Sequence, residues 1–250
     1  MTRYFAVPIY LSLVALLALN TFLLSGFASE NNPGNPDVDI PKIDRRNYSK
    51  VRTATFALGC FWGGDARFGA VPGVIRTRVG YAGGTKEDPT YYDLGDHTES
   101  IQLDYDPEEV TLEELLEIFW DFHNPHSRNY SRQYANILFY HNDRQRKIAE
   151  DSKSALAESS EKEIYTEIKE LEKFYPAEDY HQKYRLRQSQ AFMDELGDIY
   201  EDPDNLRDST AAARLNGFLA GYGTPEQVRE VLGRLGLSKR LQEKLAERFE

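Results

Sequence analysis

Residues 53–64 read TATFALGCFWGG, in which a strand pattern runs directly into a glycine-rich turn. Ala54, Phe56 and Leu58 are apolar and occupy alternate positions, as in a β-strand that buries one face. The turn is followed by DARFGAVPG at 65–73, so the segment predicts a strand, a turn and a helix in that order. We expect a mixed α/β domain to be organised around this unit.

The cysteine in this turn, Cys60, is the only one among 250 residues. The chain therefore cannot form an internal disulfide, and a structural zinc site would lack thiolate pairs, so no metal is predicted. A lone cysteine is commonly a small buried apolar residue. The predicted turn instead places Cys60 near a helix N-terminus, where unpaired N–H groups favour the thiolate. Phe61 and Trp62 are more often core residues, but they could wall a small apolar pocket beside a nucleophile.

The rest of the domain alternates between the same two kinds of pattern. Residues 111–123, TLEELLEIFWDFH, predict a helix opened by a capping box between Thr111 and Glu114. Its inward face is expected to be Leu112, Leu115, Leu116, Phe119 and Trp120. A second helix is predicted from about Asp143, and further strands at 74–81, 100–106, 135–141 and 164–170. The alternation predicts an α+β fold, a two-layer sandwich of helices on a sheet.

The two ends of the chain differ in character from the middle. Residues 4–29 carry no charge and end in small residues, which is typical of a secretory signal at 1–29; an uncleaved signal anchor is the alternative. The proline-containing stretch 30–47 predicts a flexible linker before a folded domain at 48–192. Residues 193–250 predict short helices without visible chemistry, a C-terminal extension packed on that domain.

Location and charge narrow the range of partners. The apolar N-terminal segment predicts an extracytoplasmic protein that is secreted, held in the secretory-pathway lumen or anchored to a membrane through residues 4–29. The 41 acidic and 30 basic side chains give a net charge of −11. Because a nucleic-acid backbone is itself densely negative, nucleic acid is not expected as a partner.

Several segments, in order, resemble the A-type peptide methionine sulfoxide reductases. They are GCFWGG at 59–64, GYAGG at 80–84, PTYYDLGDHTES at 89–100, YDP at 105–107, QYANILFY at 133–140 and FYPAEDYHQKY at 174–184. The resemblance covers about Thr53 to Tyr184. It implies a sandwich of ferredoxin-like plan and reduction of methionine-S-sulfoxide, free or in proteins, without a bound cofactor.

The resemblance also implies roles for individual residues. Cys60 would attack the sulfoxide sulfur, and Glu99 would protonate its oxygen, which requires a raised pKa of the kind that an apolar environment produces. The oxygen would accept hydrogen bonds from Tyr81 and Tyr134. The S-methyl group would be held by Phe61 and Trp62, and substrate would also be bound by Asn129, which stands where the family usually has an aspartate.

The reaction would leave Cys60 as a sulfenic acid. Many relatives carry C-terminal resolving cysteines, which this chain lacks, so an external thiol such as a thioredoxin- or glutaredoxin-like protein is predicted as the reductant.

Two other functions stay open at this stage. The same fold could be a non-catalytic module that binds oxidised methionine or peptides, having lost turnover through Asn129. Alternatively, Cys60 and His97 could serve an acyl-transfer enzyme, if the histidine lay close to the sulfur. Asn47 and Asn129 also begin glycosylation patterns, Asn-Tyr-Ser in both cases, and we expect Asn129 to be shielded in the fold.

Overall fold

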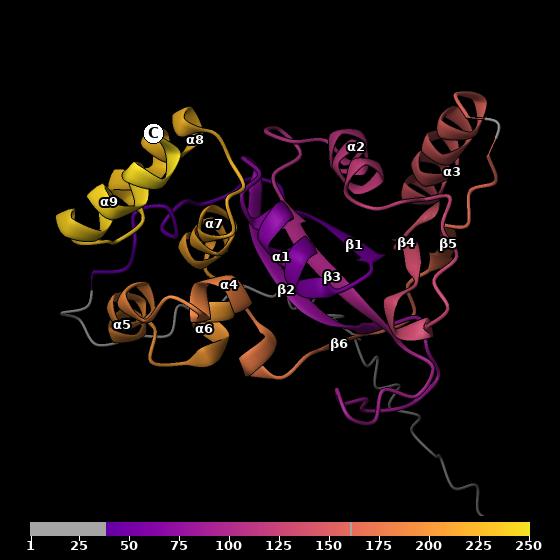
Figure 1. The fold of residues 1–250 in the computed structure, drawn as a ribbon, viewed down its shortest axis with the longest axis horizontal. Coiled ribbons are helices and arrows are strands. Elements are labelled where there is room, and N and C mark those ends of the chain that lie inside the picture. The colour runs from indigo at the N-terminus through magenta and orange to yellow at the C-terminus, as the bar shows by residue number, and fades with distance from the viewer. Residues whose placement is uncertain (1–38, 161) are drawn as a thin grey trace, which may run out of the picture. The chain divides into compact units, whose positions relative to one another are not determined.

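The computed structural model describes residues 39–160 and 162–250 (Figure 1). The predicted signal or anchor segment, 1–29, and residues 30–38 of the predicted linker lie outside the described residues. Within the described ranges, no helix combines the length and the apolar character that crossing a bilayer requires. Residues 39–160 and 162–250 belong to one compact unit.

The described strands form one mixed sheet in the order β5-β4-β1-β3-β2-β6. Their bounds are β1 Arg52–Leu58, β2 Val74–Ala82, β3 Thr98–Tyr105, β4 Asn136–Tyr140, β5 Glu167–Glu170 and β6 Phe174–Pro176. β1 lies between β3 and β4 and is antiparallel to both, and only the β4–β5 pair is parallel. Because β1 is a central strand, the turn after Leu58 lies at the end of the middle of the sheet and not beside an edge strand.

The helices confirm the predicted mixed α/β architecture. They are α1 Phe61–Gly69, α2 Leu112–Phe122, α3 Asp143–Glu158, α4 Tyr184–Arg187, α5 Gln190–Ile199, α6 Pro203–Arg207, α7 Thr210–Leu219, α8 Pro225–Val231 and α9 Lys239–Ala246. Short 3₁₀ turns are η1 Arg132–Tyr134, η2 Asp179–His181, η3 Leu232–Arg234 and η4 Glu247–Phe249. The capping box of Thr111 and Glu114 at the start of α2 is confirmed.

The core between sheet and helices is largely aromatic. The ring of Phe56 on β1 packs between Phe68 of α1 and Phe119 of α2, with centroid distances of 5.2 and 5.4 Å. Four of the five predicted inward residues of α2 are buried, but Trp120 is only half-buried. Trp120 packs against the edge of this core, and its Nε1 donates to Ser152 Oγ of α3 at 2.5 Å.

The C-terminal helices build a second hydrophobic core around α7, which is buried along its whole length. Figure 1 shows α7 beside α1. The buried guanidinium of Arg214 on α7 donates to the carbonyl oxygens of Gly69 at 2.5 Å and Val74 at 2.6 Å. Because Gly69 ends α1, this cation interacts favourably with the negative end of the helix that begins at Cys60.

The last part of the predicted linker is anchored rather than flexible. Ile43 is buried in the C-terminal core, and the Asp44 carboxylate accepts hydrogen bonds from the backbone N–H groups of Thr210 at 2.6 Å and Ala211 at 3.1 Å. Asp44 thereby satisfies two N–H groups at the first turn of α7, which that helix cannot satisfy itself. The packed chain thus begins before Tyr48, the residue at which the sequence pattern placed the domain start.

The contact between α1 and α7 depends on small residues. A Cβ atom added to Gly217 would lie 2.6 Å from both Ala66 O and Ala70 N. A Cβ atom added to Gly69 would lie 2.4 Å from Ala213 O. Both distances are shorter than van der Waals contact, so the two backbones approach closely only because these positions carry no side chain.

We expect Gly217→Ala to destabilise the fold by about 1–3 kcal/mol, since the added methyl group must push α7 away from α1. Gly197→Ala, in α5, is the matched control because a Cβ there meets nothing within 4 Å. The control should be neutral or slightly stabilising, since alanine has the higher helix propensity. Urea unfolding followed by circular dichroism measures both; equal free energies of unfolding would contradict the close approach.

Candidate active site

Cys60 lies in the tight turn between β1 and α1, as predicted. Gly59 precedes it with a φ of +83°, a conformation that glycine adopts without steric cost. Cys60 is the N-cap residue of α1, and its side chain is exposed. The thiol is therefore accessible to a reactant and stands at the positive end of the helix.

The environment of Cys60 does not, however, favour the thiolate as predicted. Desolvation by surrounding protein atoms raises the pKa of the thiol above its ordinary value. A hydrogen bond from the Trp62 backbone lowers this pKa, and the charge of Glu99 raises it. The helix start is confirmed, but desolvation outweighs it, so the free thiol predominates over the thiolate near neutral pH.

Glu99 reaches the same turn from β3. Its side chain is buried, with 2% of the residue exposed, and one oxygen accepts from the backbone N–H of Phe61 at 3.1 Å. The other accepts from Gln133 Nε2 at 2.8 Å. Burial raises the pKa of Glu99 and these two hydrogen bonds lower it, with burial dominating. The carboxyl group adjoins the residue after Cys60 and holds its proton to a higher pH than a solvent-exposed glutamate does.

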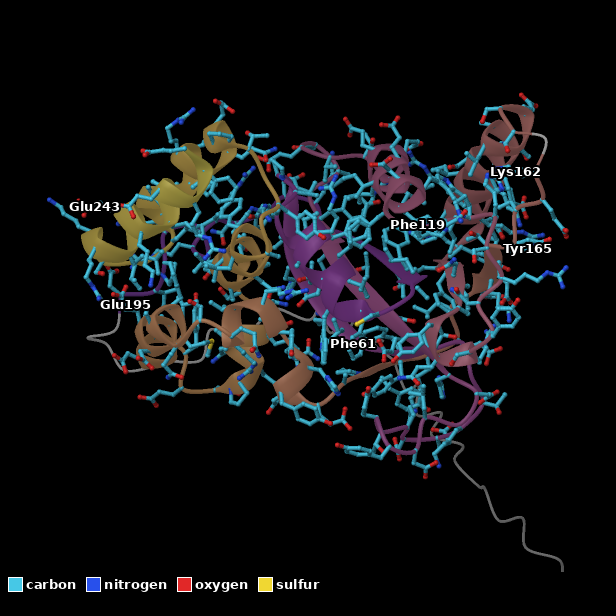
Figure 2. The ribbon with its side chains drawn as sticks, in the orientation of Figure 1. Phe61, Phe119, Lys162, Tyr165, Glu195 and Glu243 are labelled. Carbon is cyan, nitrogen blue, oxygen red and sulfur yellow. The ribbon has the colours of Figure 1, made fainter. Side chains whose placement is uncertain are left out.

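The aromatic residues after Cys60 are held by the segment at 179–184. Trp62 stacks on Tyr184 with ring centroids 3.7 Å apart and planes within 3°, and its Nε1 donates to Nδ1 of His181 at 3.3 Å. Phe61 is buried, labelled at the start of α1 in Figure 2, and packs 5.1 Å from His181. These contacts fix an apolar wall next to the thiol.

Tyr81 lies behind this wall on β2. Its ring is fully buried 6.1 Å from that of Phe61, and its hydroxyl donates to Glu178 Oε2 at 2.7 Å. The other oxygen of Glu178 accepts from the backbone N–H of Tyr91 at 3.0 Å. In this structure the Tyr81 hydroxyl donates its one hydrogen bond to Glu178.

Tyr134 lies in η1 and is 37% exposed. Desolvation, followed by the charge of Glu99, raises its pKa to about 12, and Tyr91 and Cys60 add to the shift. The phenol therefore keeps its proton throughout the physiological range and can donate it in a hydrogen bond.

Asn129 supports this turn. Its amide nitrogen donates to the backbone oxygen of Tyr134 and, at 3.2 Å, to Asn136 Oδ1. The residue is exposed, so the expectation that it is shielded was wrong, because residues 127–131 form an exposed loop on the surface. These hydrogen bonds position Tyr134, while substrate binding by Asn129 stays a prediction.

His97 braces a loop. Its Nδ1 accepts from the backbone N–H of Gly84 at 3.1 Å, and its Nε2 lies 2.7 Å from Lys86 O. Both ring nitrogens are thus occupied by backbone groups, which leaves no base for the acyl-transfer mechanism that would pair His97 with Cys60.

Four further residues belong to the site although no role was predicted for them: Gln133, Glu178, His181 and Tyr184. All four lie in segments that carried the family resemblance, 133–140 and 174–184. Their side-chain types alone gave no indication of a partner, because each contacts the site from a distant part of the chain. Among the described residues, no group of three or more His, Cys, Asp or Glu side chains is arranged to hold a metal ion.

Comparison with known proteins agrees with this arrangement. The family model described as Peptide methionine sulfoxide reductase matches residues 52–201. A peptide methionine sulfoxide reductase of Drosophila melanogaster is 43% identical over 204 residues, 81% of each chain. Peptide methionine sulfoxide reductase A5 of Arabidopsis thaliana is 35% identical over 240 residues, 92% of this chain and 91% of that one.

A solved structure shows the same relationship. The crystal structure of Mxr1 from Saccharomyces cerevisiae in reduced form has a TM-score of 0.53 and 29% identity, covering 58% of this chain and 90% of that one. The family match spans more than half of the residues and includes the strand, turn and helix around Cys60. The chain therefore belongs to the peptide methionine sulfoxide reductase family, whose members are enzymes that reduce methionine sulfoxide.

Proposed function

We propose that the site around Cys60 reduces methionine-S-sulfoxide, free or within polypeptides, with Cys60 as nucleophile and Glu99 as acid. The observation that carries this assignment is the hydrogen bond between Glu99 and the backbone N–H of Phe61, the residue after the nucleophile. It holds a buried carboxyl group of raised pKa beside the thiol. An acid positioned there can protonate an oxygen that departs from a sulfur attacked by Cys60.

The reaction balances without a bound cofactor. The Cys60 sulfur attacks the sulfoxide sulfur, Glu99 protonates the oxygen, and the oxygen is transferred to Cys60. Methionine leaves with its sulfur reduced by two electrons, and Cys60 becomes a sulfenic acid. Passage of the Cys60 proton to Glu99 would generate the thiolate nucleophile and the acid together.

The remaining pocket residues orient the sulfoxide. Phe61 and Trp62 form the apolar surface that suits an S-methyl group. Tyr134, with its phenol protonated, donates to the oxygen. Tyr81 adds a second donor when its hydroxyl exchanges Glu178 for the sulfoxide oxygen. Asn129 contributes by holding the turn that carries Tyr134, to which its amide donates.

We infer the reductant of Cys60 and the location of the protein from the sequence. An external thiol, a thioredoxin- or glutaredoxin-like protein, returns Cys60 to the thiol, since the chain has no second cysteine. The apolar segment at residues 4–29 supports an extracytoplasmic location, through a cleaved signal or a membrane anchor. A ferredoxin-like plan is supported by the element order β1-α1-β2-β3-α2-β4 and the strand order β4-β1-β3-β2.

The test uses the two epimers of methionine sulfoxide with dithiothreitol as the thiol. We expect conversion of the S epimer to methionine and no activity after Cys60→Ser. Conversion of the R epimer alone would overturn the stereochemical assignment. Tight binding of the S epimer without conversion would identify a binding module in place of an enzyme.

Replacing Glu99 with glutamine is expected to slow reduction at pH 7 by about 100-fold, since a positioned acid contributes on that scale. The same change removes the charge that raises the pKa of Cys60, so the thiol pKa should fall. More thiolate is then present at pH 7, and alkylation by iodoacetamide should become faster.

Opposite changes in the two rates separate loss of the acid from loss of the fold. Glu243→Gln, an exposed carboxylate on α9, is the matched control and should leave both rates unchanged. If Glu99→Gln slowed alkylation and reduction alike, Glu99 would be a structural residue and not the acid.

A further inference from the structure

A groove between α2 and α3 is lined by none of the residues of the site around Cys60. Its volume is about 630 Å³. The apolar lining consists of Trp120, Ile148, Ala155 and Leu156, and the carboxylates of the lining are Glu113, Glu117, Asp121 and Asp151. We call this site the α2–α3 groove. No basic side chain contributes to its lining.

The apolar part of the groove is held in a fixed arrangement. Trp120 donates from Nε1 to Ser152 on α3, and its ring packs against Phe119 at 5.1 Å and His123 at 5.7 Å. Phe119, labelled on α2 in Figure 2, is buried in the sheet-side core, whereas Trp120 is half-buried. A tryptophan held in this way presents apolar area without losing conformational freedom on binding, as residues that dominate binding interfaces do.

Within the described part of the chain, the three α2 carboxylates of the groove form no ion pair. Glu113, Glu117 and Asp121 are spaced by four residues and therefore form one stripe along the helix. Across residues 39–160 and 162–250, no Lys, Arg or His nitrogen lies within 4.0 Å of any of the three, whereas Asp151 pairs with Lys147 at 2.8 Å. Like charges at this spacing destabilise a helix, so the stripe is a surplus of negative charge that a cationic partner would neutralise.

We propose that the α2–α3 groove binds a basic amphipathic helix of a partner protein. Apolar residues of that helix would cover Trp120 and Leu156, and its Lys or Arg residues would pair with the α2 stripe. A helix is the fitting shape, because the groove runs between two helices and receives the ridge of a third. The N-terminal residues 1–38 do not supply this charge, since they contain one basic residue, Arg3. This inference does not depend on the proposed function.

The test measures binding of a fluorescein-labelled peptide of about 18 residues. Its leucines recur at every third or fourth position, so that leucine and lysine occupy opposite faces of a helix. A peptide with glutamate in place of lysine is its control. Fluorescence anisotropy is measured with the full chain and three variants. Glu117→Lys/Asp121→Lys reverses the stripe, and Ala155→Trp fills the groove with its carboxylates intact.

The third variant, Glu243→Lys/Glu247→Lys, changes net charge equally in α9 and η4. Figure 2 shows Glu243 well apart from Phe119 of α2. We expect the lysine peptide to bind, and both groove variants to weaken it at least about tenfold while the α9 variant stays within about twofold. Reduction with dithiothreitol should be unchanged in Ala155→Trp, which verifies folding.

Three results would overturn the inference. Equal weakening by the two charge reversals would mean that binding follows net charge, and full binding to Ala155→Trp would place the peptide elsewhere. Self-association of the chain that Glu117→Lys/Asp121→Lys abolishes, measured by sedimentation, would make the occupant a second copy and not a partner helix.

Discussion

Without an external thiol, the protein is expected to release one methionine per chain and then stop. Oxygen transfer leaves Cys60 as a sulfenic acid, which is normally cleared by condensation with a second thiol. The chain contains no other cysteine, so this step has no intramolecular partner. Cys60 is exposed, so a thiol can approach it from outside.

Three measurements check this result. Quantified methionine should level off at one equivalent, intact mass should increase by one oxygen atom, and dimedone should label Cys60 alone. Dithiothreitol or thioredoxin should restore turnover, with water and a disulfide as products. Cys60→Ser should give neither methionine nor label. Several turnovers in the absence of thiol, or a dimedone adduct on another residue, would contradict the single-cysteine cycle.

Lys183→Met is expected to destabilise the fold by about 3–5 kcal/mol, because it leaves the carboxylate of Asp65 buried without its cation. Both side chains are completely buried, and Lys183 Nζ lies 3.3 Å from Asp65 Oδ1. Nζ also donates to Thr77 O at 2.5 Å, and Asn216 Nδ2 donates to Asp65 Oδ2 at 3.0 Å. The network joins α1, β2 and α7, so its loss affects both cores.

The double variant Asp65→Asn/Lys183→Met is the control. It removes the uncompensated charge and keeps a carbonyl oxygen for the hydrogen bond from Asn216, so it should recover a large part of the lost stability. Urea unfolding followed by circular dichroism gives the free energies of unfolding. A loss below about 1 kcal/mol in Lys183→Met, or no recovery in the double variant, would show that the ion pair contributes little.

The local sequence pattern was sufficient to predict the elements around Cys60. Alternation at 54–58 predicted β1, and Thr111 with Glu114 predicted the start of α2, because strand period and helix capping depend on residues a few positions apart. The N-cap position of Cys60 followed from the same reasoning. Its pKa did not, because desolvation and the charge of Glu99 come from chain segments that only folding brings to the thiol.

By itself, the sequence determined the order of the elements from β1 to β5, the single cysteine, the need for an external thiol and, through its resemblance, the residues proposed as acid and apolar wall. Only the tertiary structure decided that Tyr81 donates to Glu178, that Gln133 holds Glu99 and that Arg214 meets the end of α1. The physical reason is separation along the chain. Asn216 and Asp65 are 151 positions apart, and no local period or cap specifies which distant side chain will satisfy a buried polar group.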